Sequence, residues 1–271
     1  MQTIKNLNTG KNWVILIVFI YLGLILLIPA ISVFYEAFKQ GVPTFFEAIQ
    51  QREFIQAIWL TVILSVFSVP LNTVFGLCAA WVIARNRFRG KALLMSIIDL
   101  PFSISPLVAG LMMVLLYGRN DWFNGLLEYL DVKIVFALPG MVLATIFVTL
   151  PFVAREVIPV LEEIGSEQED AARSLGATDL QIFWRVTLPG IRWGLLYGVL
   201  LTNARAVGEY GAIAVVSGNI IGKTASLPIF VELAYKNYQA QSAFAASVVL
   251  VLLAVVTLIG KEILEYYTKI D

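Results

Sequence analysis

The sequence predicts an all-α membrane protein with six transmembrane helices and a polar cytoplasmic loop between the fourth and the fifth. Three observations support this fold class. The 271-residue chain is 59% hydrophobic and only 14% charged, whereas a soluble domain carries roughly 25% charged residues. Six stretches reach the length of about 20 apolar residues that a bilayer span needs. The long polar interruption in the second half is confined to residues 170–189.

The expected spans lie near residues 14–34, 57–82, 93–117, 134–158, 194–217 and 243–264. The first is longer than a signal-peptide core, so we expect it to be retained, with a cleaved signal as the alternative. The chain has no internal repeat, and a secondary transporter would more often have one. We therefore divide it into residues 1–56, which hold an N-terminal tail, the first helix and an external loop, and a single membrane core over residues 57–266.

The Lys and Arg residues predict that both termini lie in the cytoplasm. With the N-terminus inside, cytoplasmic segments carry twelve of these residues against six outside, and the cluster from Arg85 to Lys91 is the strongest signal. This count assigns Arg155 to the cytoplasmic segment after the fourth span, and it puts the polar loop in the cytoplasm too.

Composition excludes several kinds of site. The chain has no His and one Cys, which excludes a histidine-based catalytic triad, a Cys/His zinc site and an internal disulfide. A net charge of zero gives no indication of a nucleic-acid partner. Prolines interrupt three spans, which favours helices that line a cavity over helices that face lipid; they are Pro70, Pro101, Pro106 and Pro151.

Periodicity predicts two helices in and before the polar loop. Apolar residues share one helical face up to Gly176, which should end the first helix; they are Val160, Ile164, Ala171 and Leu175. Thr178 should begin the second helix, with Gln181 completing a capping box, and Pro189-Gly190 should end it. Its apolar stripe is expected to hold Leu180, Phe183, Trp184 and Thr187 or Leu188, opposite Asp179, Gln181 and Arg185.

This loop resembles the EAA loop of bacterial ABC-importer permeases of type 1. The matching pattern is Asp170-Ala171-Ala172, three residues, Gly176, nine residues, and Val186-Thr187-Leu188-Pro189. Asp170 replaces the usual Glu and Val186 the usual Ile, and each keeps the charge sign or the apolar branching. The resemblance implies that the EAA loop, residues 160–193, carries a coupling helix that docks on a cytoplasmic ATPase. The contact residues would be Asp170, Ala171, Ala172, Gly176, Ala177, Thr178, Leu180, Phe183, Leu188 and Pro189. The alternative is an amphipathic helix lying on lipid headgroups.

Ionisable residues within spans are rare and costly, so Asp99, Arg205 and Glu209 are candidate functional residues. Arg205 and Glu209 are four residues apart and therefore share a helical face. They could form a structural ion pair or lie along a substrate path, and the sequence leaves both open. Asp99 could lie near the end of a span or pair with a partner chain.

A second resemblance narrows the family. The stretches Ala204–Gly211, Ala214–Ile220, Leu227-Pro228 and Val231-Glu232 are similar to sulfate/thiosulfate permeases of the W type, although molybdate and tungstate permeases share the first stretch. The resemblance implies a multi-pass protein of the bacterial inner membrane that forms a heterodimer with a T-type permease. Two ABC ATPase subunits and an external sulfate-binding protein would complete the importer. Expected substrate-path residues are Arg205, Glu209, Ser217 and Asn219.

Nucleotide binding by this chain itself is not expected. The segment Gly218–Thr224 reads GxxxGKT, one residue short of the phosphate-binding loop, and it follows no strand. The chain is therefore expected to hold no cofactor and to be no enzyme, while ATP and Mg²⁺ are used by the partner ATPase. The rival classes are an ion-coupled anion carrier that uses Asp99 and Glu209, and a membrane scaffold that transports nothing.

Overall fold

The computed structural model describes residues 13–118 and 122–268, and within these ranges every regular element is a helix. The predicted all-α class is therefore confirmed. Lys5, Lys11, Arg119 and Lys269, which entered the count of charges, lie outside the described residues. In chain order the elements are η1 Gly23–Leu27, α2 Ile28–Phe38, α3 Val42–Gln50, α4 Arg52–Arg85, α5 Lys91–Ser103, α6 Pro106–Tyr117, α7 Asn124–Tyr129, α8 Leu138–Thr149, α9 Pro151–Ile164, α10 Glu167–Ser174, α11 Asp179–Ile182, η2 Phe183–Thr187, α12 Leu188–Val207, α13 Gly211–Val216, α14 Leu227–Lys236 and α15 Ala240–Thr268.

The predicted count of six spans is not reproduced by length and hydropathy alone. Among the described residues, four helices are long and apolar enough to cross a membrane: Trp13–Phe38, Arg52–Arg85, Leu138–Ile164 and Ala240–Gly260. The bent pair α5 and α6, which meet at 108°, makes a fifth if it counts as one span. The predicted fifth span, residues 194–217, corresponds to most of α12 together with α13.

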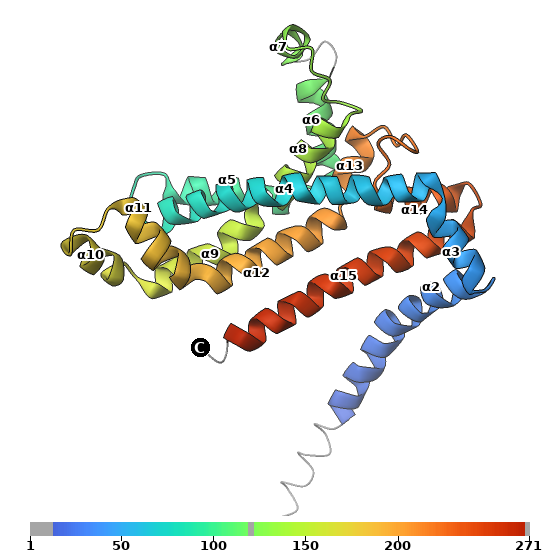
Figure 1. Ribbon diagram of the computed structural model, residues 1–271, viewed down its shortest axis with the longest axis horizontal. Helices are drawn as coiled ribbons and strands as arrows, with labels where there is room; N and C mark the ends of the chain where they lie inside the picture. The colour runs from blue at the N-terminus through green and yellow to red at the C-terminus, as the bar shows by residue number, and fades with distance from the viewer. Residues whose placement is uncertain (1–12, 119–121, 269–271) are drawn as a thin grey trace, which may run out of the picture.

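The helices form an elongated bundle with distinct ends (Figure 1). Helix α4 runs along its length and packs against α9 and α12, and α2 leaves the bundle at an angle. The short helices α10 and α11 lie at one end, whereas α3 and α14 lie near the other. The loop predicted to be cytoplasmic is thus separated from the α3 and α14 region by most of the length of the molecule.

Glycines allow α4, α9 and α12 to pack closely. A Cβ on Gly76 of α4 would lie 2.6 Å from the Val153 Cβ of α9, and one on Gly198 of α12 would lie 3.0 Å from the Val153 Cα. A Cβ on Gly194 would lie 2.8 Å from Val160 Cγ2. Small residues at helix contacts let backbones approach within membranes, where lipid provides little hydrophobic drive for association. These three helices thus hold the polar loop that connects α9 to α12.

The prolines have different effects on the backbone. Pro70 lies inside the continuous helix α4, and Pro101 lies inside α5. Pro106 begins α6 immediately after the bend between α5 and α6, and Pro151 begins α9 after α8. A proline fits the first turn of a helix because the N–H group that it lacks has no intrahelical partner there.

Candidate functional site

The polar loop begins with two backbone breaks. Helix α9 ends at Ile164, and Gly165 has φ +69°; α10 then runs from Glu167 to Ser174, and Gly176 has φ +87°. Both glycines have a positive φ, which costs other residues energy. Gly176 ends a helix as predicted, but the first helix does not extend across Gly165. The expected common face is therefore wrong: Ile164 packs in the core, whereas Leu175 is 90% exposed.

The second predicted helix begins as the sequence indicated. Thr178 is the N-cap of α11, its Oγ1 accepts from the Gln181 backbone N–H at 3.4 Å, and the Thr178 N–H donates to Gln181 Oε1 at 2.9 Å. The predicted end at Pro189-Gly190 is wrong. Helix α11 passes through the π-helix η2 directly into α12, where Pro189 occupies the first turn. A proline in that position is compatible with a helix, so the short helix is rigidly joined to a long one.

The predicted apolar stripe is divided between two faces. Leu180 and Trp184 are exposed, as is Leu175 before them. Phe183 instead turns inward, where its ring stacks on Trp81 of α4 at a centroid distance of 5.1 Å. Buried Ile182 also anchors this side. Three large apolar side chains at the end of the molecule thus lack cover within the single chain, which is what a docking surface needs.

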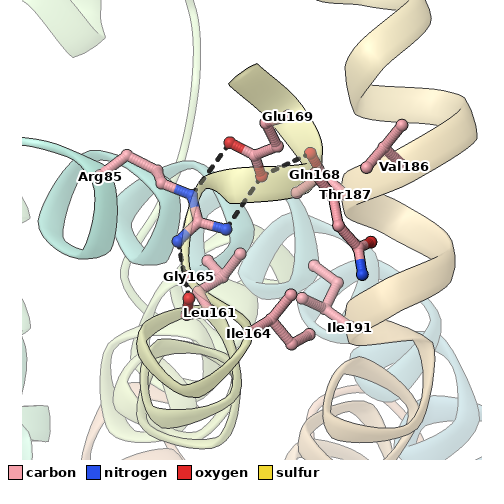
Figure 2. A pocket seen from close by; sticks show the side chains of 9 residues that line it. All are labelled: Arg85, Leu161, Ile164, Gly165, Gln168, Glu169, Val186, Thr187 and Ile191. Carbon is pink, nitrogen blue, oxygen red and sulfur yellow. Dashed lines mark hydrogen bonds and ion pairs between the residues drawn. The ribbon is translucent and has the colours of Figure 1, made fainter. Parts of the chain in front are cut away.

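An unpredicted ion pair ties this loop to α4 (Figure 2). Arg85, the last residue of α4, donates from Nε and Nη2 to the two Glu169 carboxylate oxygens at 3.0 and 2.9 Å. Its Nη1 donates to the Leu161 carbonyl at 2.6 Å, and Thr187 Oγ1 donates to Glu169 Oε1 at 2.8 Å. Glu169 is only 6% exposed. Four backbone segments, α4, α9, α10 and η2, therefore meet at one bidentate pair.

Sequence reasoning missed Glu169 because it precedes the matched motif by one residue. It counted Arg85 only as one of several cytoplasmic cations. The sequence did contain a signal for a buried acidic residue. Glu169 and Asp170 are neighbours near the start of a helix, so they cannot both point to the same side of it. In the structure, Asp170 is exposed and pairs at 2.9 Å with exposed Arg173, while Glu169 is buried.

Other predicted coupling residues lie in the backbone framework of the loop. The Ala171 carbonyl accepts from the Leu175 N–H at 3.1 Å, and the Ala172 carbonyl accepts from the Ala177 N–H at 3.1 Å. Leu188 is the first residue of α12. Together with Asp170, Gly176, Thr178, Leu180, Phe183 and Pro189, these residues belong to one continuous segment at the end of the bundle. Whether they contact an ATPase stays a prediction.

The predicted substrate-path residues Arg205 and Glu209 form an ion pair. Arg205 Nη1 lies 2.7 Å from Glu209 Oε2, and Glu209 Oε1 accepts from the Ala212 N–H at 2.8 Å. Glu209 is buried, whereas the Arg205 side chain is 33% exposed. Glu209 thus also caps the start of α13. The geometry is compatible with a structural pair that keeps one arginine edge open.

Ser217 and Asn219 lie in a turn after α13. The Ser217 hydroxyl donates to Asn219 Oδ1 and accepts from the Asn219 N–H, both at 3.1 Å. Thr224 Oγ1 donates to the Ser217 carbonyl at 2.7 Å and accepts from the Ile220 N–H at 3.1 Å. These groups are committed to the turn itself. Their role on a substrate path stays a prediction.

Asp99 of α5 pairs with Arg155 of α9. Arg155 Nε donates to Asp99 Oδ1 at 2.7 Å, and its guanidinium carbon lies 4.5 Å from the centre of the Phe102 ring. Arg155 lies within the helix Leu138–Ile164, which is long and apolar enough to cross a membrane. The positive-inside count included Arg155 among the cytoplasmic cations, although position 155 already lies inside the expected span 134–158.

Comparison with known proteins identifies the family. Residues 72–266 match the family model described as "Binding-protein-dependent transport system inner membrane component". The chain belongs to this family. The match includes the polar loop and the pairs of Arg85, Arg155 and Arg205, so the sites described above are part of a transport-system membrane component.

Curated relatives of this transport component align over nearly its whole length. It is 67% identical over 258 residues, 95% of this chain and 94% of the relative, to the sulfate transport system permease protein CysW of Synechocystis sp.. It is 46% identical to the protein of the same name from Escherichia coli, over 97% of this chain and 90% of the relative. The sulfate transport system permease protein CysT of Salmonella typhimurium is 38% identical over 84% and 83%.

Solved structures share the fold of this transport component. A bacterial ABC transporter involved in the import of alginate aligns with TM-score 0.78 and 20% identity, over 99% of both chains. The alginate ABC transporter in complex with a periplasmic protein aligns equally well, at 21% identity over 94% of both chains. At this identity the likeness shows the fold alone.

Proposed function

We propose that this chain is the membrane-spanning permease subunit of an ATP-driven importer for sulfate or thiosulfate, and that it provides half of the translocation path. The observation that carries the proposal is the 67% identity, over 95% of the chain, to a sulfate transport system permease protein. The family match favours this reading over an ion-coupled carrier.

We propose six spans, with α12 and α13 forming the fifth, and both termini in the cytoplasm of a bacterial cell whose inner membrane holds the chain. Helix α12 continues directly from the polar loop and ends at Val207, near which Glu209 caps α13. A 20-residue helix reaches about 30 Å at 1.5 Å per residue, which matches the hydrocarbon core. The positive charge cluster after α4 supports this orientation.

Coupling to the ATPase would use the exposed side of α10 and α11. Leu175, Leu180 and Trp184 would fill an apolar cleft of the partner, and Glu169 with Arg85 would transmit its movement to α4, α9 and α12. The ATP and Mg²⁺ would be held by two ATPase subunits, so this chain would have no enzymatic activity of its own. Rigid attachment matters because a loose loop would absorb the movement of the ATPase.

The other partners would be a T-type permease and an external sulfate-binding protein. The relatives include both W-type and T-type sulfate permeases, and a structural neighbour is complexed with a periplasmic protein. The T-type chain would supply the other half of the path as a heterodimer. The binding protein would dock at the end of the bundle near α3 and α14, opposite the coupling loop. Membrane lipid would surround the assembly, and no nucleic acid would take part.

Affinity purification from the native membrane tests the assembly. The tagged chain should copurify with one different permease and with an ABC ATPase at a ratio of one to one to two. Mass spectrometry of intact subunits would measure that ratio. Recovery of the chain alone or only with copies of itself, from membranes that take up sulfate, would contradict the proposed assembly.

A further inference from the structure

Helices α5 and α9 are joined by two ion pairs in register. Lys91 Nζ lies 3.2 Å from Glu162 Oε1, and Arg155 Nε lies 2.7 Å from Asp99 Oδ1. The two pairs are eight residues apart on α5 and seven apart on α9, in opposite chain directions. At 1.5 Å per residue the second pair is about 10–12 Å farther from the coupling loop than the first.

The deeper pair, Asp99 with Arg155, lies within two candidate spans, and yet both side chains are partly exposed on the surface of the chain. Asp99 belongs to the bent pair α5 and α6, and Arg155 to the span Leu138–Ile164. The exposed fractions of their side chains are 37% and 53%. Charged groups inside a membrane face a water-filled path or protein, because contact with lipid is expensive. This open face of α5 and α9 therefore requires water or a neighbouring subunit beside it.

Arg155 also keeps most of its donors unused. The Arg155 Nε–H group donates to Asp99. Within residues 13–118 and 122–268, neither terminal nitrogen of Arg155 donates a hydrogen bond. Arg85 provides the contrast: all three of its nitrogens donate to protein oxygens, and its side chain is only 12% exposed. Arginine has five N–H donors in a planar fork. All the nitrogens of Arg85 thus serve a structural link. In Arg155 only the Nε–H group is bonded, and the two terminal nitrogens are available to a ligand.

We propose that Arg155 is an anion-binding residue on the inner half of the translocation path, where its two terminal nitrogens contact a divalent tetrahedral oxyanion. Asp99 and the ring of Phe102, 4.5 Å away, hold the guanidinium in place. The inference rests on the proposed function, since it takes the oxyanion from there. A planar fork that offers paired donors suits a tetrahedral oxyanion better than an ammonium group does.

The Asp99 carboxylate gives the contact a second property. It offsets the charge of Arg155, so the oxyanion is attracted less strongly than by a bare cation and can leave toward the cytoplasm. Passage requires a contact strong enough to admit the ion and weak enough to release it. Arg205 and Glu209 form a second arginine–carboxylate pair, near the end of α12 that is farther from the coupling loop. The path would then have two such pairs at different depths.

Uptake by the reconstituted complex tests the proposal. Labelled sulfate and the binding protein are supplied on one side of the vesicle membrane and ATP on the other. Arg155→Lys keeps the charge but loses the fork, so the initial rate at limiting sulfate should fall on the order of tenfold or more. Lys91→Gln is the matched control, because it removes the other ion pair between the same helices; its rate should stay within about twofold of the unmodified complex.

A double variant separates anion contact from helix pairing. If the ion pair only joins α5 to α9, Arg155→Gln combined with Asp99→Asn should restore uptake that Arg155→Gln alone loses. The proposal predicts no restoration. Near-normal uptake by Arg155→Lys, or rescue in the double variant, would overturn it. If the unmodified complex takes up no sulfate, the proposed function itself fails, and this result is distinct from a failure of Arg155 alone.

Chemical access gives a readout that does not depend on transport. In a chain whose Cys78 is replaced by Ala, Arg155→Cys should react with a charged methanethiosulfonate that does not enter lipid. Phe19→Cys, on a helix whose apolar window has no buried residues, should not react and serves as the control. An unreactive thiol at position 155 in the assembled complex would mean that lipid or a subunit covers this face, and would refute the proposal.

Discussion

Replacement of Glu169 with Gln removes the charge at the junction of four backbone segments and leaves Arg85 without its ionic partner. The native carboxylate accepts three hydrogen bonds, at 3.0, 2.9 and 2.8 Å; Glu169 is buried, and the Arg85 side chain is only 12% exposed. Breaking a buried pair from one side costs about 3–5 kcal/mol. The coupling loop, residues 165–187, should therefore open between about a hundredfold and a few thousandfold more often, at tenfold per 1.4 kcal/mol.

Amide hydrogen exchange on the assembled complex measures this opening. Protection in residues 166–187 should fall in Glu169→Gln, while protection in α15 should stay unchanged. Arg173→Ala is the matched control, because its pair with Asp170 is exposed on both sides and such pairs contribute about 0–1 kcal/mol. Equal protection in Glu169→Gln and the unmodified chain would refute the role of this pair in holding the loop.

Three further predictions concern backbone and topology. Gly176→Val should uncouple ATP hydrolysis from uptake, because φ +87° costs a β-branched residue about 1–3 kcal/mol or re-aims α11; an unchanged ratio of ATP hydrolysed to sulfate imported would contradict this. Gly76→Leu should lower the thermal unfolding temperature of the complex, since even its Cβ would lie 2.6 Å from Val153 Cβ; an unchanged temperature would mean that α4 and α9 do not pack this closely. A cysteine inserted within residues 85–91 of a chain lacking Cys78 should react with an impermeant thiol reagent only after the membrane is opened, and reaction from outside would invert the topology.

The sequence predicted the local features that depend on neighbouring residues. The capping box of Thr178 and Gln181 and the left-handed Gly176 follow from chemistry within a few residues, and both occur where expected. The end of the second helix was mispredicted because a proline tolerates the first turn of the following helix as well as it ends a preceding one. Composition cannot distinguish these two uses of Pro189.

Contacts between distant segments could not be predicted in the same way. Glu169 and Arg85 are 84 residues apart, and Asp99 and Arg155 are 56 apart. Charge counting treated each of these arginines as an independent cytoplasmic cation, because nothing in one sequence states which carboxylate a cation will meet. Their pairing depends on helix packing: Gly76 and Ala154 let α4 and α9 approach closely, and α5 packs against the same cluster through Leu94 and Ile98.

ATP-driven uptake of labelled sulfate tests the central claim most directly. Vesicles are prepared with the purified complex of this chain, its permease partner, the ATPase and the binding protein, without an ion gradient or membrane potential. The account predicts that sulfate accumulates only when ATP and Mg²⁺ reach the ATPase side, and that accumulation persists when ionophores dissipate any gradient. Accumulation that needs an imposed ion gradient and proceeds without ATP would contradict the account, because it would identify an ion-coupled carrier.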